Sequence, residues 1–133
     1  MSKTGPLRIV YVVDGDASVR EGLSRLMDSA GLEPRPCASV EEFLVKVDGN
    51  HPACVLLDVP SAWKSEADVR TSLHAVAGRL PVIALSSSDS STARRRAREL
   101  GAQHFFRKPV DAAALLDSIE WVALSDGRNA PSP

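Results

Sequence analysis

Residues 7–16 of the chain read LRIVYVVDGD, seven mainly apolar residues followed by three that favour a loop. β-Branched and aromatic residues dominate the first seven, so this segment is predicted to be a buried strand that ends in a polar loop. Apolar residues then recur at spacings of three and four over residues 19–30, and Gly31 follows them. That pattern predicts an amphipathic helix with a C-terminal glycine stop.

The same pairing of a strand with a helix repeats along the chain and gives five strand–helix units. The predicted strands are residues 7–13, 32–37, 53–57, 80–85 and 103–106, and the predicted helices are residues 19–30, 39–47, 67–77, 93–100 and 115–123. Strands that are apolar throughout are buried on both faces, and strands joined through helices run parallel with right-handed crossovers. The predicted fold class is therefore α/β, a doubly wound parallel sheet with helices on both faces.

Composition indicates one globular domain, and the net charge requires any charged partner to be recognised through a local patch. The chain has 133 residues, of which 44% are hydrophobic and 25% are charged, as expected for a single core. Its formal net charge of -1 provides no overall field to attract nucleic acid or an anionic membrane. A secretion signal and an apolar run of roughly 20 residues are both missing, so a cytoplasmic location is expected. Cys37 and Cys54 lie in apolar stretches and are predicted to be buried reduced thiols.

Polar residues follow four of the predicted strands. These residues are Asp14, Asp58, Ser86 and Lys108, after the first, third, fourth and fifth strands. Functional groups of doubly wound sheets collect beyond the carboxyl ends of the strands, so we expect all four at one edge. A carboxylate can attack phosphorus, a second carboxylate can hold a divalent cation, and a hydroxyl and an ammonium can take phosphoryl oxygens. The set is suited to the phosphorylation of an aspartate.

With these residues in place, the sequence resembles the response-regulator receiver domain of two-component signalling. The family has an acidic pair after its first strand, an aspartate after its third, a hydroxyl residue after its fourth and a Lys-Pro pair after its fifth. The corresponding residues here are Asp14, Asp58, Ser86 and Lys108-Pro109. Residues 100–109, LGAQHFFRKP, are also similar to the family's passage into its Lys-Pro pair.

The resemblance implies an architecture and a division of the chain. The expected sheet is flavodoxin-like, with five parallel strands in the order 2-1-3-4-5. Residues 7–124 would form the receiver domain, residues 1–6 an N-terminal extension, and residues 125–133 a flexible tail or linker.

The resemblance also implies roles for individual residues. Asp58 would be the phosphoacceptor, and its phosphodonor a sensor histidine kinase or a phosphotransfer protein. Lys108 and Ser86 would hold phosphoryl oxygens, and Ser86 and Phe105 would be the switch residues. The surface from Arg94 to Leu124 would bind a second copy of the chain or an output protein. Direct contact with nucleic acid or membrane is not expected, nor is enzymatic turnover.

Two departures from the family pattern concern the Mg²⁺ site. Gly15 stands where receivers carry the second acidic residue, which binds the metal directly, and glycine offers no carboxylate. Asp16 could compensate through a shift of the loop. Pro60, displaced relative to the family's proline, can still present its backbone carbonyl to a metal. Asp14, Asp58, the Pro60 carbonyl and Asp16 are thus the candidate ligands, and Mg²⁺ binding is expected to be weak or absent.

Several alternative interpretations remain open. The loss at Gly15 also suits a degenerate pseudo-receiver that acts as an interaction module without phosphorylation. The segment from Asp14 to Ser18 resembles the nucleophile motif of haloacid-dehalogenase-like phosphatases, although no late strand carries that family's paired acids. Asp14 alone could be the N-cap of the first helix. The arginine run at residues 94–98 could be a solvated helix face instead of a partner surface.

Overall fold

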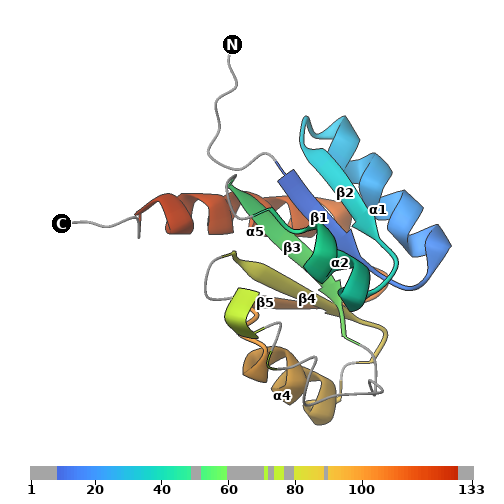
Figure 1. Ribbon diagram of the computed structural model, residues 1–133, viewed down its shortest axis with the longest axis vertical. Helices are drawn as coiled ribbons and strands as arrows, with labels where there is room; N and C mark the ends of the chain where they lie inside the picture. Colours follow the sequence, from blue (N-terminus) through green and yellow to red (C-terminus); the bar gives the residue numbers. More distant parts are fainter. Residues whose placement is uncertain are drawn as a thin grey trace.

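The computed structural model describes residues 9–48, 52–59, 71, 74–76, 80–88 and 90–128, with side chains described as far as residue 122. Strands and helices alternate along this part of the chain (Figure 1). The strands are β1 (Ile9–Val13), β2 (Glu33–Cys37), β3 (Ala53–Asp58), β4 (Val82–Ser86) and β5 (His104–Arg107). The helices are α1 (Ala17–Ser29), α2 (Val40–Lys46), α4 (Ser91–Glu99) and α5 (Ala112–Arg128). Most of the helix predicted at residues 67–77 lies outside the described residues. The part of it that is described, residues 71 and 74–76, is helical.

The five strands form one parallel sheet in the order β2-β1-β3-β4-β5, as the resemblance to receivers implied. The register pairs Val13 with both Cys37 and Leu57, and Asp58 with Leu85. Because the strands are parallel and in register, their carboxyl ends meet at one edge of the sheet. That edge carries every polar residue that the sequence nominated after a described strand.

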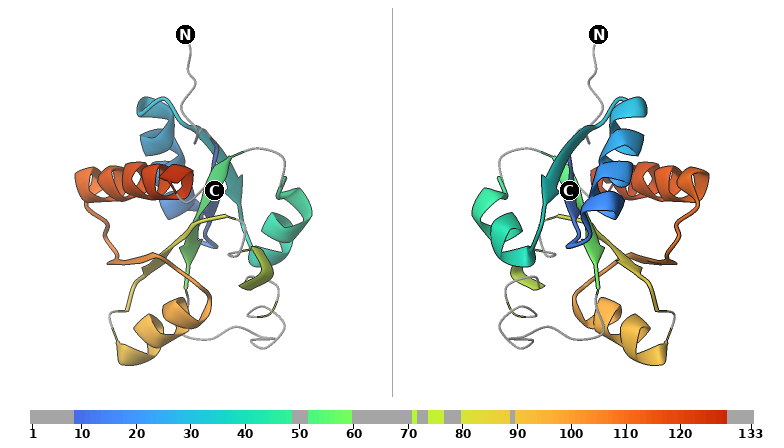
Figure 2. Two further views of the ribbon diagram at one scale, coloured as in Figure 1. Left: turned by 90° about the vertical axis from the view of Figure 1, so that its left-hand side faces the viewer. Right: turned by 90° about the vertical axis from the view of Figure 1, so that its right-hand side faces the viewer.

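Helices cover both faces of the sheet, as expected for strands that are apolar throughout. Figure 2 shows α1 and α5 together on one face and α2 on the opposite face. Alternate residues of a strand point to opposite faces, so Val10 and Val12 pack with the α1/α5 side while Tyr11 and Val13 pack with the α2/α4 side. The residues of β1 are all buried, which explains why this strand reads as a continuous apolar run.

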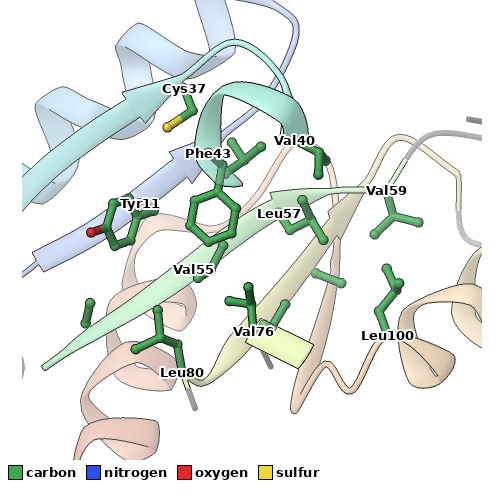
Figure 3. Close-up of a cluster of buried hydrophobic side chains, with 14 of the residues drawn as sticks. Tyr11, Cys37, Val40, Phe43, Val55, Leu57, Val59, Val76, Leu80 and Leu100 are labelled. Carbon is green, nitrogen blue, oxygen red and sulfur yellow. The ribbon is translucent and has the colours of Figure 1, made fainter. Parts of the chain in front are cut away.

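The core on the α2/α4 side is organised around two aromatic rings (Figure 3). Tyr11 and Phe43 are fully buried and meet edge to face, with ring centroids 5.2 Å apart. The Tyr11 hydroxyl accepts a hydrogen bond of 3.0 Å from the Asp48 N–H, so its polar atom is satisfied within the core. Cys37 packs in the same cluster, and both Cys37 and Cys54 are free and buried, as predicted.

Helices α1 and α2 each begin after a residue whose side chain caps the helix N-terminus. Asp16 is the N-cap of α1, because its carboxylate accepts hydrogen bonds from the N–H groups of Ser18 and Val19. The interpretation of Asp14 as this cap is therefore wrong. Ser39 caps α2, because its hydroxyl accepts a hydrogen bond from the Glu42 N–H.

Strand ends differ from the sequence prediction by one or two residues. Regular pairing of β4 begins at Val82 and not at Leu80, because the Leu80 N–H donates to the Val76 carbonyl and Pro81 has no N–H. At the other end, β4 continues through Ser86, so this serine belongs to the sheet itself.

Candidate functional site

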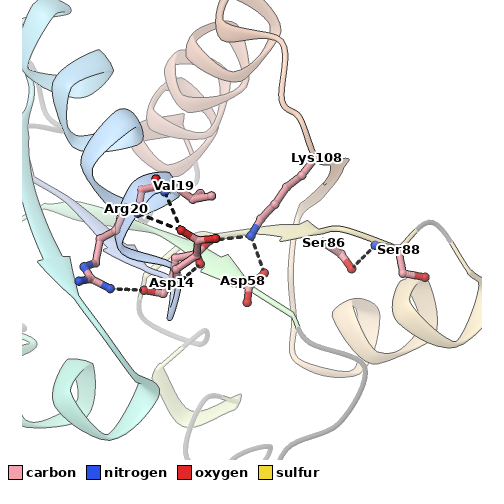
Figure 4. A network of polar contacts seen from close by, with 9 residues as sticks. Asp14, Val19, Arg20, Asp58, Ser86, Ser88 and Lys108 are labelled. Carbon is pink, nitrogen blue, oxygen red and sulfur yellow. Dashed lines mark hydrogen bonds and ion pairs between the residues drawn. The ribbon is translucent and has the colours of Figure 1, made fainter.

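Three of the nominated residues meet in one ionic contact at the carboxyl edge of the sheet. The Lys108 ammonium lies 2.7 Å from Asp14 Oδ2 and 2.8 Å from Asp58 Oδ1 (Figure 4). Asp14 directly follows β1, Asp58 ends β3, and Lys108 directly follows β5. Their side chains are 3%, 25% and 17% exposed, so the ammonium is shared between two carboxylates with little solvent around it.

Hydrogen bonds hold both the backbone and the carboxylate of Asp14 in place. Its N–H donates to the Cys37 carbonyl at 3.1 Å, and its carbonyl accepts from Arg20 Nη1 at 2.8 Å. Its Oδ1 accepts from the Asp16 N–H at 2.9 Å, and its Oδ2 accepts from Lys108. A buried carboxylate is tolerated only when it is paired and hydrogen-bonded in this way. Asp14 is thus a fixed part of the site.

Ser86 lies on the same edge and is linked to Lys108 through the backbone. It is buried, and its carbonyl accepts a hydrogen bond of 2.8 Å from the Lys108 N–H. Its hydroxyl accepts from the Ser88 N–H at 3.1 Å. A cis peptide bond joins Lys108 to Pro109.

The environment makes Asp58 a stronger base than a free aspartate. Burial raises the pKa of Asp58, the negative charge of Asp14 raises it further, and the hydrogen bond from Lys108 opposes both effects. For Lys108, burial lowers the pKa, but the hydrogen bonds to Asp14 and Asp58 outweigh this and the net shift is upward. The site therefore combines a carboxylate of increased basicity with a neighbouring ammonium.

The described residues offer two side-chain carboxylates, Asp14 and Asp58, to the divalent-metal site that the resemblance to receivers implies. Gly15 contributes no side chain, and the Asp16 carboxylate is engaged in the cap of α1. Across the described part of the chain, no group of three or more His, Cys, Asp or Glu side chains is placed to hold a metal ion. Pro60, the candidate carbonyl ligand, lies outside the described residues.

A cavity of about 280 Å³ opens beside this site. Its lining residues are Val13, Asp14, Gly15, Ala38, Ser39, Val40, Glu41 and Asp58. A Cβ atom added at Gly15 would have the Ala38 carbonyl oxygen, 3.8 Å away, as its nearest neighbour. The space for a side chain at position 15 is thus present.

Two contacts of the site were not foreseen from the sequence. Arg20, in the first turn of α1, donates a hydrogen bond to the Asp14 carbonyl, and only its basic character hinted at a polar role. The Arg94 guanidinium carbon lies 4.8 Å from the centre of the Phe105 ring, at a distance typical of cation–π pairs. The sequence had placed Phe105 and the arginine run on one predicted partner surface, but it did not predict their direct contact.

Comparison with known proteins assigns the family. Residues 10–120 match the model of the response regulator receiver domain, and the chain belongs to this family. The match covers most of the described sheet and both ends of the Asp14–Lys108 contact.

Relatives and solved structures agree with this assignment. The chain is 34% identical over 119 residues to the transcriptional regulatory protein TdiR of Thauera aromatica, covering 89% of this chain and 52% of TdiR. It is 32% identical over 111 residues to the response regulator protein TodT of Pseudomonas putida, covering 84% of this chain and 49% of TodT. A structure of the response regulator StyR aligns with a TM-score of 0.77 and 32% identity, covering 92% of this chain and 63% of that one. The chain thus spans about half the length of these curated relatives.

Proposed function

We propose that this domain accepts a phosphoryl group on Asp58 from a sensor histidine kinase or a phosphotransfer protein, and that phosphorylation alters a protein-binding surface. The observation that supports this most directly is the contact of Lys108 with Asp58 and Asp14 at 2.8 and 2.7 Å. Membership of the receiver family and the match to proteins named as response regulators make this chemistry the expected one.

In the proposed transfer, an Asp58 carboxylate oxygen attacks phosphorus and forms an acyl phosphate, while the bond from phosphorus to the donor's imidazole nitrogen breaks. Charge on the phosphoryl oxygens is balanced by the Lys108 ammonium, which already lies at hydrogen-bond distance from Asp58. The Ser86 hydroxyl, which accepts a hydrogen bond from the Ser88 N–H, would donate its own proton to a phosphoryl oxygen. Burial of Asp58 raises its pKa and so increases the basicity of the attacking oxygen.

The proposed output surface runs from Arg94 to Leu124, across α4, β5 and α5. Arg94 stacks on Phe105 there, beside a groove of about 170 Å³ that Arg98 also lines. The positive charge of this face suits an acidic surface on an output protein or on a second copy of the chain. A movement of Ser86 towards a phosphoryl group would reach Phe105 through the adjacent strands β4 and β5, because Ala84 pairs with Phe105.

Further parts of the proposal follow from the same assignment. We expect Mg²⁺ to bind weakly or not at all, because Gly15 replaces an acidic ligand. The function is signalling and not turnover of a substrate, and a cytoplasmic location suits a kinase as phosphodonor. Among the described residues no helix is long and apolar enough to cross a membrane. We do not expect direct binding to nucleic acid or membrane.

The comparisons support neither of the alternative functions. The match of residues 10–120 to the receiver family gives no support to a haloacid-dehalogenase-like phosphatase. The alternative of an interaction module without phosphorylation rests on Gly15 and the displaced Pro60, and the relatives of this chain carry the names of response regulators.

The proposal is tested by intact-protein mass spectrometry after incubation with a small phosphodonor, with and without Mg²⁺. The natural chain should gain the mass of one phosphoryl group, and Asp58→Asn, which keeps the shape of the side chain, should gain none. Equal labelling of both proteins would place the phosphoacceptor elsewhere. If neither the natural chain nor Gly15→Asp gained a phosphoryl group, the proposed phosphorylation would be rejected.

A further inference from the structure

The acidic pocket of this chain contains a cation of its own. Of the acidic residues in the loop after β1, Asp16 is engaged in capping α1, with its carboxylate 2.9 Å from the Ser18 N–H. The two carboxylates that remain, on Asp14 and Asp58, both contact the Lys108 ammonium. The pocket thus holds two carboxylates around one permanent positive charge.

The bonds of Asp14 direct it towards this ammonium. Its side chain is 3% exposed, and each of its oxygens already accepts a hydrogen bond, Oδ1 from the Asp16 N–H and Oδ2 from Lys108. The backbone of Asp14 is also held in place: its carbonyl accepts a hydrogen bond from Arg20, and its N–H donates to a carbonyl of β2. A carboxylate fixed in this way orients Lys108 over Asp58.

The charges of the pocket also disfavour a divalent ion. Asp14, Asp58 and Lys108 together carry a formal charge of about -1, and an acidic residue at position 15 would make this about -2. An ammonium at 2.7 and 2.8 Å from the two carboxylates occupies the region in which a shared cation would sit. A dication would have to displace it, and in doing so would gain two carboxylates instead of three.

We propose that in this receiver the Lys108 ammonium takes the place of the divalent cation, with Asp14 as the positioning residue that holds it over Asp58. The pocket is then organised for a phosphoryl group without Mg²⁺. This inference deepens the proposed function and rests on it for the identity of the anion. The cation itself can be tested independently of phosphorylation.

The test uses Mn²⁺, whose unpaired electrons broaden the NMR signals of nearby amides, and follows the backbone amides of Gly15, Asp58 and Val59. Gly15→Asp restores the missing carboxylate in a space where the nearest atom to a new Cβ is 3.8 Å away. Gly15→Ala adds the Cβ alone and is the matched control. Lys108→Met removes the ammonium and keeps the apolar stem.

The natural chain and Gly15→Ala should show only weak broadening that does not saturate. Gly15→Asp should show saturable broadening centred on this pocket, at least about tenfold tighter, because it adds one carboxylate. Lys108→Met should also bind Mn²⁺ more tightly than the natural chain, by roughly tenfold or more, because a competing charge has gone.

Saturable binding by the natural chain as tight as that of Gly15→Asp would overturn the proposal. An unchanged Mn²⁺ affinity in folded Lys108→Met would do so as well, since Lys108 would then be a bystander. If Lys108→Met does not fold, Lys108→Gln, which removes the charge and keeps a hydrogen-bond donor, takes its place in the comparison. Labelling of Asp58 by a phosphodonor is a separate measurement, so its failure would remove the proposed function and leave the assignment of the cation standing.

Discussion

Replacement of Lys108 by methionine should destabilise the fold through the two carboxylates that it leaves behind. Asp14 is 3% exposed, and Asp58 is 25% exposed, so neither can be fully solvated when the ammonium is removed. Breaking a buried ion pair from one side typically costs about 3–5 kcal/mol, and partial exposure of Asp58 reduces its share. We expect the free energy of unfolding to fall by roughly 3 kcal/mol at neutral pH. Urea denaturation of both proteins measures this difference.

The pH dependence supplies a second signature of the same change. Removal of Lys108 removes the effect that lowers the pKa of Asp58, so burial and the charge of Asp14 raise that pKa further. A carboxyl group with a raised folded pKa stabilises the folded state below its unfolded pKa, and this is lost as the pH rises through the folded value. The destabilisation should therefore be smaller at about pH 5 than at about pH 8. In the natural chain, the raised pKa of Lys108 gives stability that persists below 10.5 and is lost above it.

The control is Arg95→Met, which breaks an ion pair with Glu99 on the surface of α4. This pair is long, at 4.0 Å, and its side chains are 59% and 44% exposed. Its loss should change the free energy of unfolding by less than about 1 kcal/mol. If Lys108→Met cost no more than Arg95→Met, or if its penalty did not shrink at lower pH, the electrostatic account of the site would be refuted.

Other expected outcomes concern the supports of the site. Tyr11→Phe should lower the free energy of unfolding by about 1 kcal/mol in urea denaturation, because the Asp48 N–H loses its acceptor; no change would show that water replaces it. Asp16→Ala should lower the free energy of unfolding by about 1 kcal/mol, because α1 loses its N-cap. If Asp16 serves only as this cap, the substitution should leave the rate of phosphorylation unchanged. Burial raises the pKa of Cys54 to about 12, so a thiol reagent near pH 8 should modify it only upon unfolding; rapid labelling of the native protein would contradict its burial.

The fold could be predicted from the sequence because its signals are local and repeated. Continuous apolar runs such as the one that contains Tyr11 indicate strands buried on both faces, and their alternation with helical periodicity requires a parallel sheet. The parallel sheet in turn brings Asp14, Asp58 and Lys108 to one edge, although the first and the last lie 94 positions apart in the sequence. The residues that meet could thus be named, while their distances could not.

What escaped prediction depends on side-chain geometry within a few ångströms. Asp14 and Asp16 are both acidic residues of one loop, and only the backbone conformation decides which of them caps α1 and which faces Lys108. The stacking of Arg94 on Phe105 likewise depends on how closely α4 packs against β5. Such contacts join residues whose spacing in sequence carries no period, so no pattern announces them.

The central claim, that Asp58 is the phosphoacceptor, is tested most directly by chemical trapping. Borohydride reduces an aspartyl phosphate to homoserine, and peptide mass spectrometry then identifies the position. After treatment with a phosphodonor, we expect homoserine at position 58 and aspartate retained at positions 14 and 16. Homoserine at position 14 or 16, or at none of the three in a chain that gained a phosphoryl group, would contradict this account.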